Sequence, residues 1–265
     1  MRLSISNIAW EANQDKALYQ EMRRLGYSGL EIAPTRLFSE HPYSRQKEAF
    51  FWAGDLYAGY GITVSSMQSV WYGRKERLFG TEEERNILLS YTMEAIDFAQ
   101  AIGCRNLVFG SPVNRNLKAG EDAEAAIPFF RKLGDYAASH GTVLSLEANP
   151  SVYRTNFMNT TKEAIEIARK VDSEGIRVNL DLGTVICNGE KLQELGKDWK
   201  WIHHIHISEP YLKPVQPGES HKELAELLAA CNGYGGYLSI EMGKGLSVEK
   251  IAAVMKKVRD IYYEI

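Results

Sequence analysis

Short hydrophobic runs alternate along the whole chain with longer segments whose apolar residues recur every three to four positions. The short runs are rich in Val, Ile and Leu, as buried parallel strands are, and the longer segments have the period of amphipathic helices. We predict eight strands, at Leu3–Ala9, Gly29–Ala33, Ile62–Gln68, Asn106–Ser111, Thr142–Ala148, Arg177–Leu182, His203–Glu209 and Tyr237–Met242. A helix is expected after each strand, with a short one around Lys191–Leu195 after the sixth and the last at Val248–Tyr263.

The order of these elements predicts the fold class. Strand followed by helix, repeated eight times, implies parallel strands joined by right-handed crossovers. Eight such units favour an α/β fold of the closed (β/α)8 type, a TIM barrel, over an open doubly wound sheet. The first strand-to-helix turn, Asn7–Glu11, has no Gly-rich dinucleotide fingerprint. Because no Pro/Ser-rich linker interrupts the pattern, residues 1–265 are expected to form one domain.

Local signals support the helices. Thr81 is followed by three glutamates, which is typical of a helix that begins with a capping threonine and acids in its first turn. Apolar residues then recur at helical spacing up to Ile102, and Gly103 ends the segment. We therefore expect a long helix after the third strand.

Composition narrows the partners. The net charge is −3 and the pI about 6.1, so no basic excess is available to neutralise a nucleic-acid backbone. The three cysteines, Cys104, Cys187 and Cys231, are far apart and lack CxxC spacing, as expected of reduced thiols in a cytoplasmic protein. The chain starts directly as a strand, so we expect no signal peptide, and no apolar run is long enough to cross a membrane.

The seventh strand holds three of the six histidines. Side chains alternate along a strand, so His204 and His206 are predicted to face one side and His203 the helix-facing side. A histidine near the end of a buried strand is either a hydrogen-bonded core residue or a ligand. Which role His206 has depends on the residues that end the neighbouring strands.

Carboxylates end those neighbouring strands: Glu147 the fifth, Asp181 the sixth and Glu241 the eighth. Any one acid alone could cap a helix or form a salt bridge. In a barrel, however, four consecutive strands bring these three acids and His206 together at the end where active sites lie. Such a group is costly to bury unless a divalent cation offsets its charge, and three oxygen donors with one nitrogen suit Mn²⁺, Mg²⁺, Co²⁺ or Zn²⁺.

Other polar residues lie nearby. Glu31, at the end of the second strand, could support a ligand, contact substrate or form an ion pair; we assign it to substrate binding. His204 is predicted to lie below His206 as a buried supporting group. Asn149 and Glu209 are candidates for orienting the metal ligands through hydrogen bonds.

Four motifs in order carry a family resemblance: Leu146–Pro150, Asn179–Gly183, His204–Pro210 and Ser239–Met242. With them the chain resembles the xylose isomerase-like TIM barrels, which include ketose 3-epimerases, hydroxypyruvate isomerase, inosose dehydratase and abasic-site endonucleases. The resemblance implies that Glu147, Asp181, His206 and Glu241 bind one metal ion. It also implies that Glu147 and Glu241 form an acid/base pair acting through a cis-enediolate, and it allows a homodimer.

The chain departs from the epimerase pattern at three positions. Thr184 stands where many relatives have histidine, Tyr153 where the epimerases have a substrate-binding glutamate, and Leu212 where they have an arginine. The metal ligands are thus retained, but the substrate pocket differs from that of a free-ketose epimerase. The abasic endonucleases use further histidines for a three-metal cluster, and the second and third strands here have none.

Loops after the strands contain arginines and aromatic residues. The arginines are either surface residues or binders of an anionic group: Arg36, Arg74, Arg115 and Arg154. The aromatic residues could cover a sugar ring or line a lid: Trp10, Trp71, Tyr72 and Tyr153. His221 is a further candidate substrate contact. For substrate binding we select Trp10, Glu31, Arg115, Tyr153 and His221.

The leading hypothesis is a divalent-metal-dependent isomerase or epimerase of a sugar, sugar phosphate or sugar acid. A dehydratase of a keto-sugar or keto-inositol is the alternative, because it would remove the same type of α proton. An abasic-site endonuclease and a non-catalytic ligand-binding barrel are the remaining alternatives.

Overall fold

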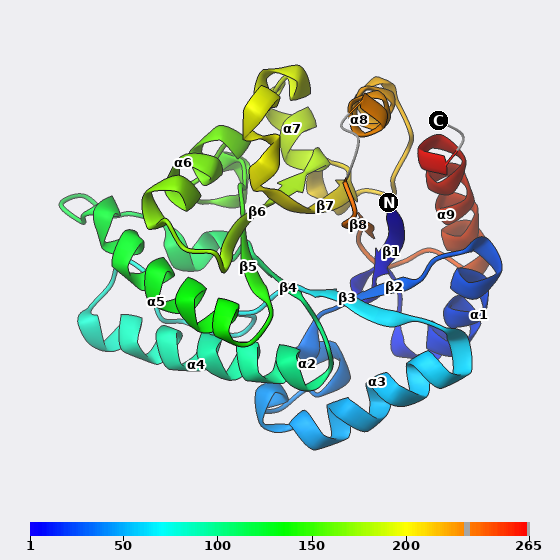
Figure 1. Cartoon of the computed structure of the whole chain (residues 1–265), viewed down its shortest axis with the longest axis horizontal. Helices are drawn as coiled ribbons and strands as arrows, with labels where there is room; N and C mark the ends of the chain where they lie inside the picture. The colour runs from blue at the N-terminus through cyan, green and yellow to red at the C-terminus, as the bar shows by residue number, and fades with distance from the viewer. Residues whose placement is uncertain (231–233, 264–265) are drawn as a thin grey trace.

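The computed structural model describes residues 1–230 and 234–263, so Cys231 lies outside the described residues. Eight parallel strands form a closed barrel in chain order, with β1 paired to β8 (Figure 1). The predicted (β/α)8 fold is confirmed. The strands are β1 (Arg2–Ser6), β2 (Gly29–Ile32), β3 (Thr63–Met67), β4 (Asn106–Phe109), β5 (Val143–Glu147), β6 (Ile176–Asp181), β7 (Ile202–Ser208) and β8 (Tyr237–Glu241).

Helices surround the barrel and bury its outer face (Figure 1). They are α1 (Asp15–Leu25), α2 (Pro34–Leu37), α3 (Gln46–Tyr60), α4 (Glu82–Ala101), α5 (Ala126–Ser139), α6 (Thr161–Val171), α7 (Leu182–Asn188), α8 (Glu219–Ala230) and α9 (Val248–Tyr263). Short 3-10 helices occupy Asn7–Ala9, Ala12–Gln14, Pro42–Ser44, Pro112–Arg115, Ala123–Ala125 and Ser151–Tyr153. Two further 3-10 segments, Leu192–Trp201 and Pro210–Leu212, are interrupted by non-helical backbone at Gly196 and Tyr211. No helix in the described ranges is long and apolar enough to cross a membrane.

The predicted start of α4 is confirmed in detail. Thr81 Oγ1 accepts a hydrogen bond from Glu84 N at 3.2 Å, and Glu84 Oε2 accepts one from Thr81 N at 2.8 Å. These reciprocal bonds satisfy two backbone donors that the helix itself leaves unpaired. The local sequence therefore determines where this helix begins.

The sequence prediction missed helix α7 and made several strands too long. Strand β6 ends at Asp181 and α7 begins at the next residue, Leu182. The side chain of Asp181 caps this helix, since its Oδ1 accepts a hydrogen bond from Thr184 N at 2.6 Å. The hydrophobic run Leu182–Ile186 continues that of the strand, so periodicity does not mark the boundary.

The inside of the barrel is lined with polar side chains rather than filled with aliphatic ones. Ser4 Oγ lies 2.6 Å from Ser65 Oγ, and Asn106 Nδ2 donates to Ser66 Oγ at 2.9 Å. Asn106 Oδ1 accepts a hydrogen bond from Ser145 Oγ at 2.5 Å. Because buried polar groups are tolerated when they are hydrogen-bonded, this network can support charged side chains above it.

The prediction that His203 faces the helices is wrong. Strand β6 pairs Val178 with Ile202 and Asn179 with His204, so the register shifts and His203 is left out of the ladder. His203 Nδ1 lies 2.9 Å from Asn106 Oδ1, an atom of the barrel interior. The bulge breaks the two-residue alternation on which the prediction depended.

Candidate metal centre

The four predicted ligands meet at the carboxyl ends of β5 to β8. His206 Nδ1 lies 3.0 Å from Glu147 Oε1, 3.3 Å from Glu241 Oε2 and 4.0 Å from Asp181 Oδ2. One ligand atom of each residue lies within 4.8 Å of the others. The fold therefore gathers three carboxylates and one imidazole around a common point.

The chemistry of this group fits a divalent cation. His206 Nδ1 is buried and makes no hydrogen bond, although it faces three carboxylates. Burial would lower the pKa of His206, but the charges of Glu31 and Glu241 raise it well above its usual value. A positive charge is thus strongly favoured at this point, and a metal ion bound to Nδ1 would supply it.

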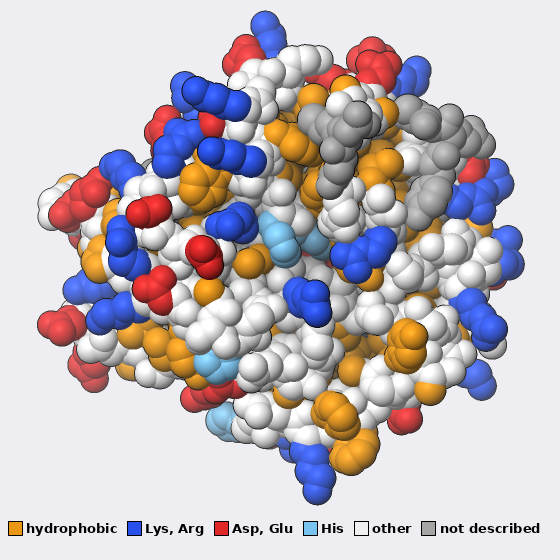
Figure 2. Space-filling view, viewed as in Figure 1, with side chains coloured by type: hydrophobic (Ala, Val, Ile, Leu, Met, Phe, Trp, Pro, Cys, Tyr) orange, Lys and Arg blue, Asp and Glu red, His pale blue; other side chains and the backbone are white. Residues whose placement is uncertain are grey.

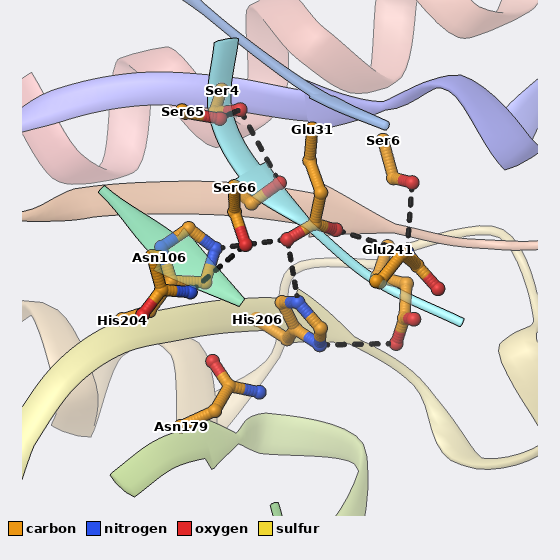
Figure 3. A network of polar contacts seen from close by, with 12 residues as sticks. Ser4, Ser6, Glu31, Ser65, Ser66, Asn106, Asn179, His204, His206 and Glu241 are labelled. Atoms are coloured by element: carbon orange, nitrogen blue, oxygen red, sulfur yellow. Dashed lines mark hydrogen bonds and ion pairs between the residues drawn. The ribbon is translucent and has the colours of Figure 1, made fainter. Parts of the chain in front are cut away.

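Glu31 lies beneath His206 and holds its ring. Glu31 Oε2 lies 3.0 Å from His206 Nε2 and 3.0 Å from His204 Nε2 (Figure 3). Glu31 Oε1 accepts a hydrogen bond from Gln68 Nε2 at 2.9 Å. With Nε2 donating to Glu31, Nδ1 is the ring atom left to face the carboxylates.

The position of Glu31 bears on the predictions made for Glu31 itself and for His204. Glu31 is fully buried, and both of its oxygens are engaged by side chains of the barrel interior. Its placement favours a supporting role over the substrate contact that we assigned to it. His204 lies below His206, at the place predicted for a buried supporting residue.

Two amides hold the carboxylate of Glu147. Asn149 Nδ2 donates to Oε2 at 3.0 Å, and Asn179 Nδ2 donates to Oε1 at 2.7 Å. Arg115 Nη2 in turn donates to Asn149 Oδ1 at 2.7 Å. Burial would raise the pKa of Glu147, but bonds and charges from His206, Asn149 and Arg115 bring it below its ordinary value. Asn149 is thus placed as predicted.

The sequence did not lead us to Asn179 and Ser208, which contact two of the predicted ligands, Glu147 and Asp181. Ser208 Oγ donates to Asp181 Oδ2 at 2.5 Å and accepts a hydrogen bond from Gly183 N at 2.8 Å. Asn179 precedes Asp181 by two residues and Ser208 follows His206 by two, so each shares a face with a ligand. Strand alternation was the signal that could have identified both.

Glu241 has a different environment from Glu147. Burial raises the pKa of Glu241 to about 7, and repulsion from Glu147 and Asp181 adds to this effect. Burial also raises the pKa of Asp181, and the charge of Glu147 raises it further. Glu147 and Glu241, which both lie close to His206, therefore differ in proton affinity.

Three predicted substrate residues are buried, with partners in the protein. Trp10 Nε1 donates to Asp15 Oδ1 at 2.6 Å, and His221 Nδ1 accepts a hydrogen bond from Gly218 N at 3.3 Å. Arg115 is fully buried, and burial lowers its pKa to about 9. Its Nε and Nη1 have no hydrogen-bond partner in the described chain. None of these three side chains presents an open surface to a ligand.

Tyr153 is half-buried in the loop after β5. Its hydroxyl accepts a hydrogen bond from Tyr211 N at 2.7 Å, which links the loops after β5 and β7. Burial raises the pKa of Tyr153, and the charges of Asp181 and Glu241 contribute to the rise. Tyr153 thus lies at the carboxyl end of the barrel, within electrostatic range of Asp181 and Glu241.

Glu209 is directed towards its own loop. Its Oε1 accepts a hydrogen bond from Gln216 N at 3.2 Å and lies 3.8 Å from His221 Nε2. The described contacts of this carboxylate include none of the four ligands. Its predicted role in orienting a ligand has no support from these contacts.

The loop arginines do not form one anion site. Arg36 pairs with Asp15 at 2.6 Å and Arg74 pairs with Glu76 at 2.5 Å, whereas Arg154 is exposed. Among the aromatic candidates, Trp71 is a core residue and Tyr72 is 71% exposed. These loops therefore give no sign of a shared phosphate pocket at this end of the barrel.

Comparison with known proteins identifies the family. Residues 19–260 match the model of the xylose isomerase-like TIM barrels, which is most of the chain. The chain therefore belongs to this family, and it is an enzyme of this family, as its motifs predicted. No curated protein matches the sequence.

Several solved structures share the fold. A D-psicose 3-epimerase from Clostridium cellulolyticum H10, solved with D-tagatose, aligns with a TM-score of 0.79 at 16% identity, covering 100% of this chain and 99% of that chain. A 3-keto-D-glucoside 4-epimerase from E. coli aligns with a TM-score of 0.76 at 19% identity, covering 98% and 99%. The IOLI protein with a bound zinc atom gives 0.73 at 17% identity, covering 100% and 99%. At these identities the likeness shows the fold.

Proposed function

We propose that this protein is a divalent-metal-dependent isomerase or epimerase of a carbohydrate. The observation that carries the proposal is the pair of glutamates close to His206, with Asp181 completing the set. The names of similar structures, a psicose epimerase and a ketoglucoside epimerase, support a sugar substrate. The zinc atom bound in another supports a bound metal ion.

Glu147, Asp181, His206 and Glu241 would hold the cation. Mn²⁺, Mg²⁺, Co²⁺ and Zn²⁺ all accept three carboxylates and one imidazole. When bound, the cation would stabilise negative charge on the oxygens of the substrate. Glu31 keeps His206 Nε2 engaged, so that Nδ1 stays directed at the carboxylates.

The two glutamates would move the proton. Asn149 and Asn179 fix the orientation of Glu147 by one hydrogen bond to each oxygen. Glu241 lies at the end of β8, and its Oε2 is 3.3 Å from His206 Nδ1. One carboxylate would take a proton from the carbon beside the carbonyl, giving a cis-enediolate, and the other would return one.

The test is the variant Glu241→Gln. We expect turnover to fall by about a hundredfold to ten-thousandfold, the usual contribution of a positioned acid or base, while the fold persists. Activity would be followed by NMR on a panel of ketoses and keto-sugars in D₂O, with circular dichroism as the check of folding. Glu226→Gln, at an exposed position on α8, removes the same charge and is expected to keep full activity.

The products distinguish the possible reactions. Deuterium incorporated without loss of water would indicate epimerisation or isomerisation through an enediolate, and loss of water would indicate a dehydratase. Turnover without exchange would indicate a hydride shift. A fully active Glu241→Gln enzyme would contradict the mechanism. The proposal also includes a cytoplasmic location, a homodimer, and no nucleic-acid or membrane partner.

A further inference from the structure

A large cavity lies at the amino-terminal end of the barrel, opposite the carboxylate cluster. Its volume is about 850 Å³, and its wall includes residues at or beside the starts of β1, β3, β4, β7 and β8. Cavities that bind small molecules in proteins span roughly 300–1,000 Å³. The space is therefore large enough for an organic ligand, and its place in the fold separates it from the metal ligands.

The charged side chains in the described part of the cavity wall are all basic. Arg2, Arg105 and Lys200 line it, whereas no Asp or Glu belongs to the described part of its wall. The whole chain has more acidic than basic residues, 34 against 31, so the wall of the cavity is more basic than the chain as a whole. Figure 2 shows a histidine near the middle of the molecule's face in this view, with several Lys and Arg side chains around it. A cavity with this charge attracts anions.

Part of the cationic wall is held in place by the chain. Arg2 Nη2 donates to Gly235 O at 3.1 Å, and the guanidinium carbon of Arg2 lies 4.1 Å from the centre of the Tyr237 ring. By contrast, Arg105 and Lys200 have no side-chain partner among the described residues. The cavity thus combines one fixed guanidinium with two cations whose hydrogen-bonding groups are free for a ligand.

His203 adds an acceptor to the wall. Asn106 Nδ2 donates to Ser66 Oγ, so Asn106 Oδ1 is the atom that accepts from His203 Nδ1 at 2.9 Å. The proton on Nδ1 leaves Nε2 as an acceptor. Burial lowers the pKa of His203 to about 4, and so the ring stays neutral at neutral pH. Beside the cations, this nitrogen would accept a hydrogen bond from a ligand hydroxyl.

Aromatic rings complete the wall. Trp199 and Tyr234 both line the cavity, with their ring centres 6.2 Å apart. Rings of this kind pack against the carbon skeleton of small polar molecules. The wall therefore matches a ligand that has three features: an anionic group for the cations, a hydroxyl group for the neutral acceptor, and a carbon skeleton for the aromatic faces.

We propose that this cavity binds a small phosphate ester that carries hydroxyl groups. The phosphate lies against Arg2, Arg105 and Lys200, and a hydroxyl of the ligand donates to His203 Nε2. Guanidinium groups favour phosphate because their paired N–H donors match its oxygens. The site goes beyond the proposed catalytic function and does not depend on it.

The test uses glycerol 3-phosphate, which has the required groups and no carbonyl for the proposed reaction. Isothermal titration of the purified full-length protein at low ionic strength is expected to show saturable binding. The double variant Arg105→Ala/Lys200→Ala is expected to bind glycerol 3-phosphate at least about tenfold more weakly. Tenfold corresponds to the loss of roughly one charge-assisted contact, so it is the lower limit for removing two cations. The matched control Lys16→Ala/Lys47→Ala removes two exposed cations from α1 and α3, and its affinity should equal that of the wild type.

A second measurement locates the ligand. In NMR spectra, the imidazole signals of His203 should shift on titration with glycerol 3-phosphate, while those of the exposed His41 should not. Absence of saturable binding up to about 10 mM glycerol 3-phosphate would overturn the proposal. Equal weakening in both double variants would also overturn it, because it would indicate a general charge effect. Tighter binding of citrate than of glycerol 3-phosphate would overturn the phosphate assignment.

Discussion

At the scale of single residues, Glu31 holds the imidazole of His206 in the candidate metal centre. Its carboxylate contacts two histidines that follow it in the chain by more than 170 residues. Without it, the ring of His206 could rotate or present its other nitrogen to the carboxylates. Outer hydrogen bonds of this type commonly raise metal affinity by orienting the ligand.

Glu31→Gln is therefore expected to weaken metal binding by about 10-fold to 100-fold, the usual effect of losing such a partner. The amide keeps the shape of the side chain but has only one acceptor oxygen and no charge. Affinity for Mn²⁺ and Co²⁺ would be measured by titration in competition with a chelator. Unchanged affinity in Glu31→Gln, beside the control Glu226→Gln, would show that Glu31 does not position His206.

The lowered pKa of the buried His221 predicts that the stability of the fold depends on pH. Burial lowers its pKa from 6.5 to about 4 in the folded protein, so below pH 6.5 the unfolded chain binds more protons than the folded one. Stability is then lost as the pH falls from about 6.5 towards 4, and the loss at pH 5 is about 2 kcal/mol. Urea unfolding at pH 7 and pH 5 should show a smaller loss for His221→Gln than for the wild type. Equal losses in the two proteins would contradict this.

At the scale of elements, the contact between α5 and the start of β6 limits which residues the chain accepts. A Cβ atom on Gly175 would lie 1.9 Å from Gly134 O and 2.8 Å from Ala138 N. Both are backbone atoms of α5, so they cannot move aside as the end of a side chain can. The helix could accommodate the extra atom only by moving away from the strand.

Gly175→Ala is expected to lower the free energy of unfolding by about 3 kcal/mol, at the upper end of typical overpacking. Gly54→Ala is the matched control, since a Cβ there meets no atom within 4 Å on the exposed side of α3. It should raise stability by about 0.5–1 kcal/mol, because alanine favours the helix over glycine. Denaturant unfolding of both variants measures the difference, and equal stabilities would refute the packing argument.

At the scale of the whole molecule, the barrel closes around a polar interior that ends in the carboxylate cluster. Glu147, Asp181 and Glu241 are held close together by three strands that the closed sheet keeps in register. Their mutual repulsion opposes folding, and a cation removes it. Metal binding should therefore stabilise the entire barrel rather than one loop.

Mn²⁺, Co²⁺ or Zn²⁺ at a hundred times its dissociation constant is expected to stabilise the fold by about 2.7 kcal/mol. For a chain of this size, that corresponds to a rise of roughly 5–10 °C in the unfolding midpoint. Differential scanning calorimetry would measure it, with the variant Glu147→Gln/Asp181→Asn expected to show little or no rise. The same rise in this variant would place the metal elsewhere.

Local patterns in the amino-acid sequence were enough to predict the eight-unit barrel and to place four ligand candidates at consecutive strand ends. They could do so because strand and helix periods are local properties, and parallel strands in chain order make neighbours predictable. Three features became visible only in the folded chain: Glu31 contacts His204 and His206, Asp15 pairs with Arg36, and a bulge turns His203 inward. These contacts depend on strand register and on residues far apart in the chain, which no local pattern records.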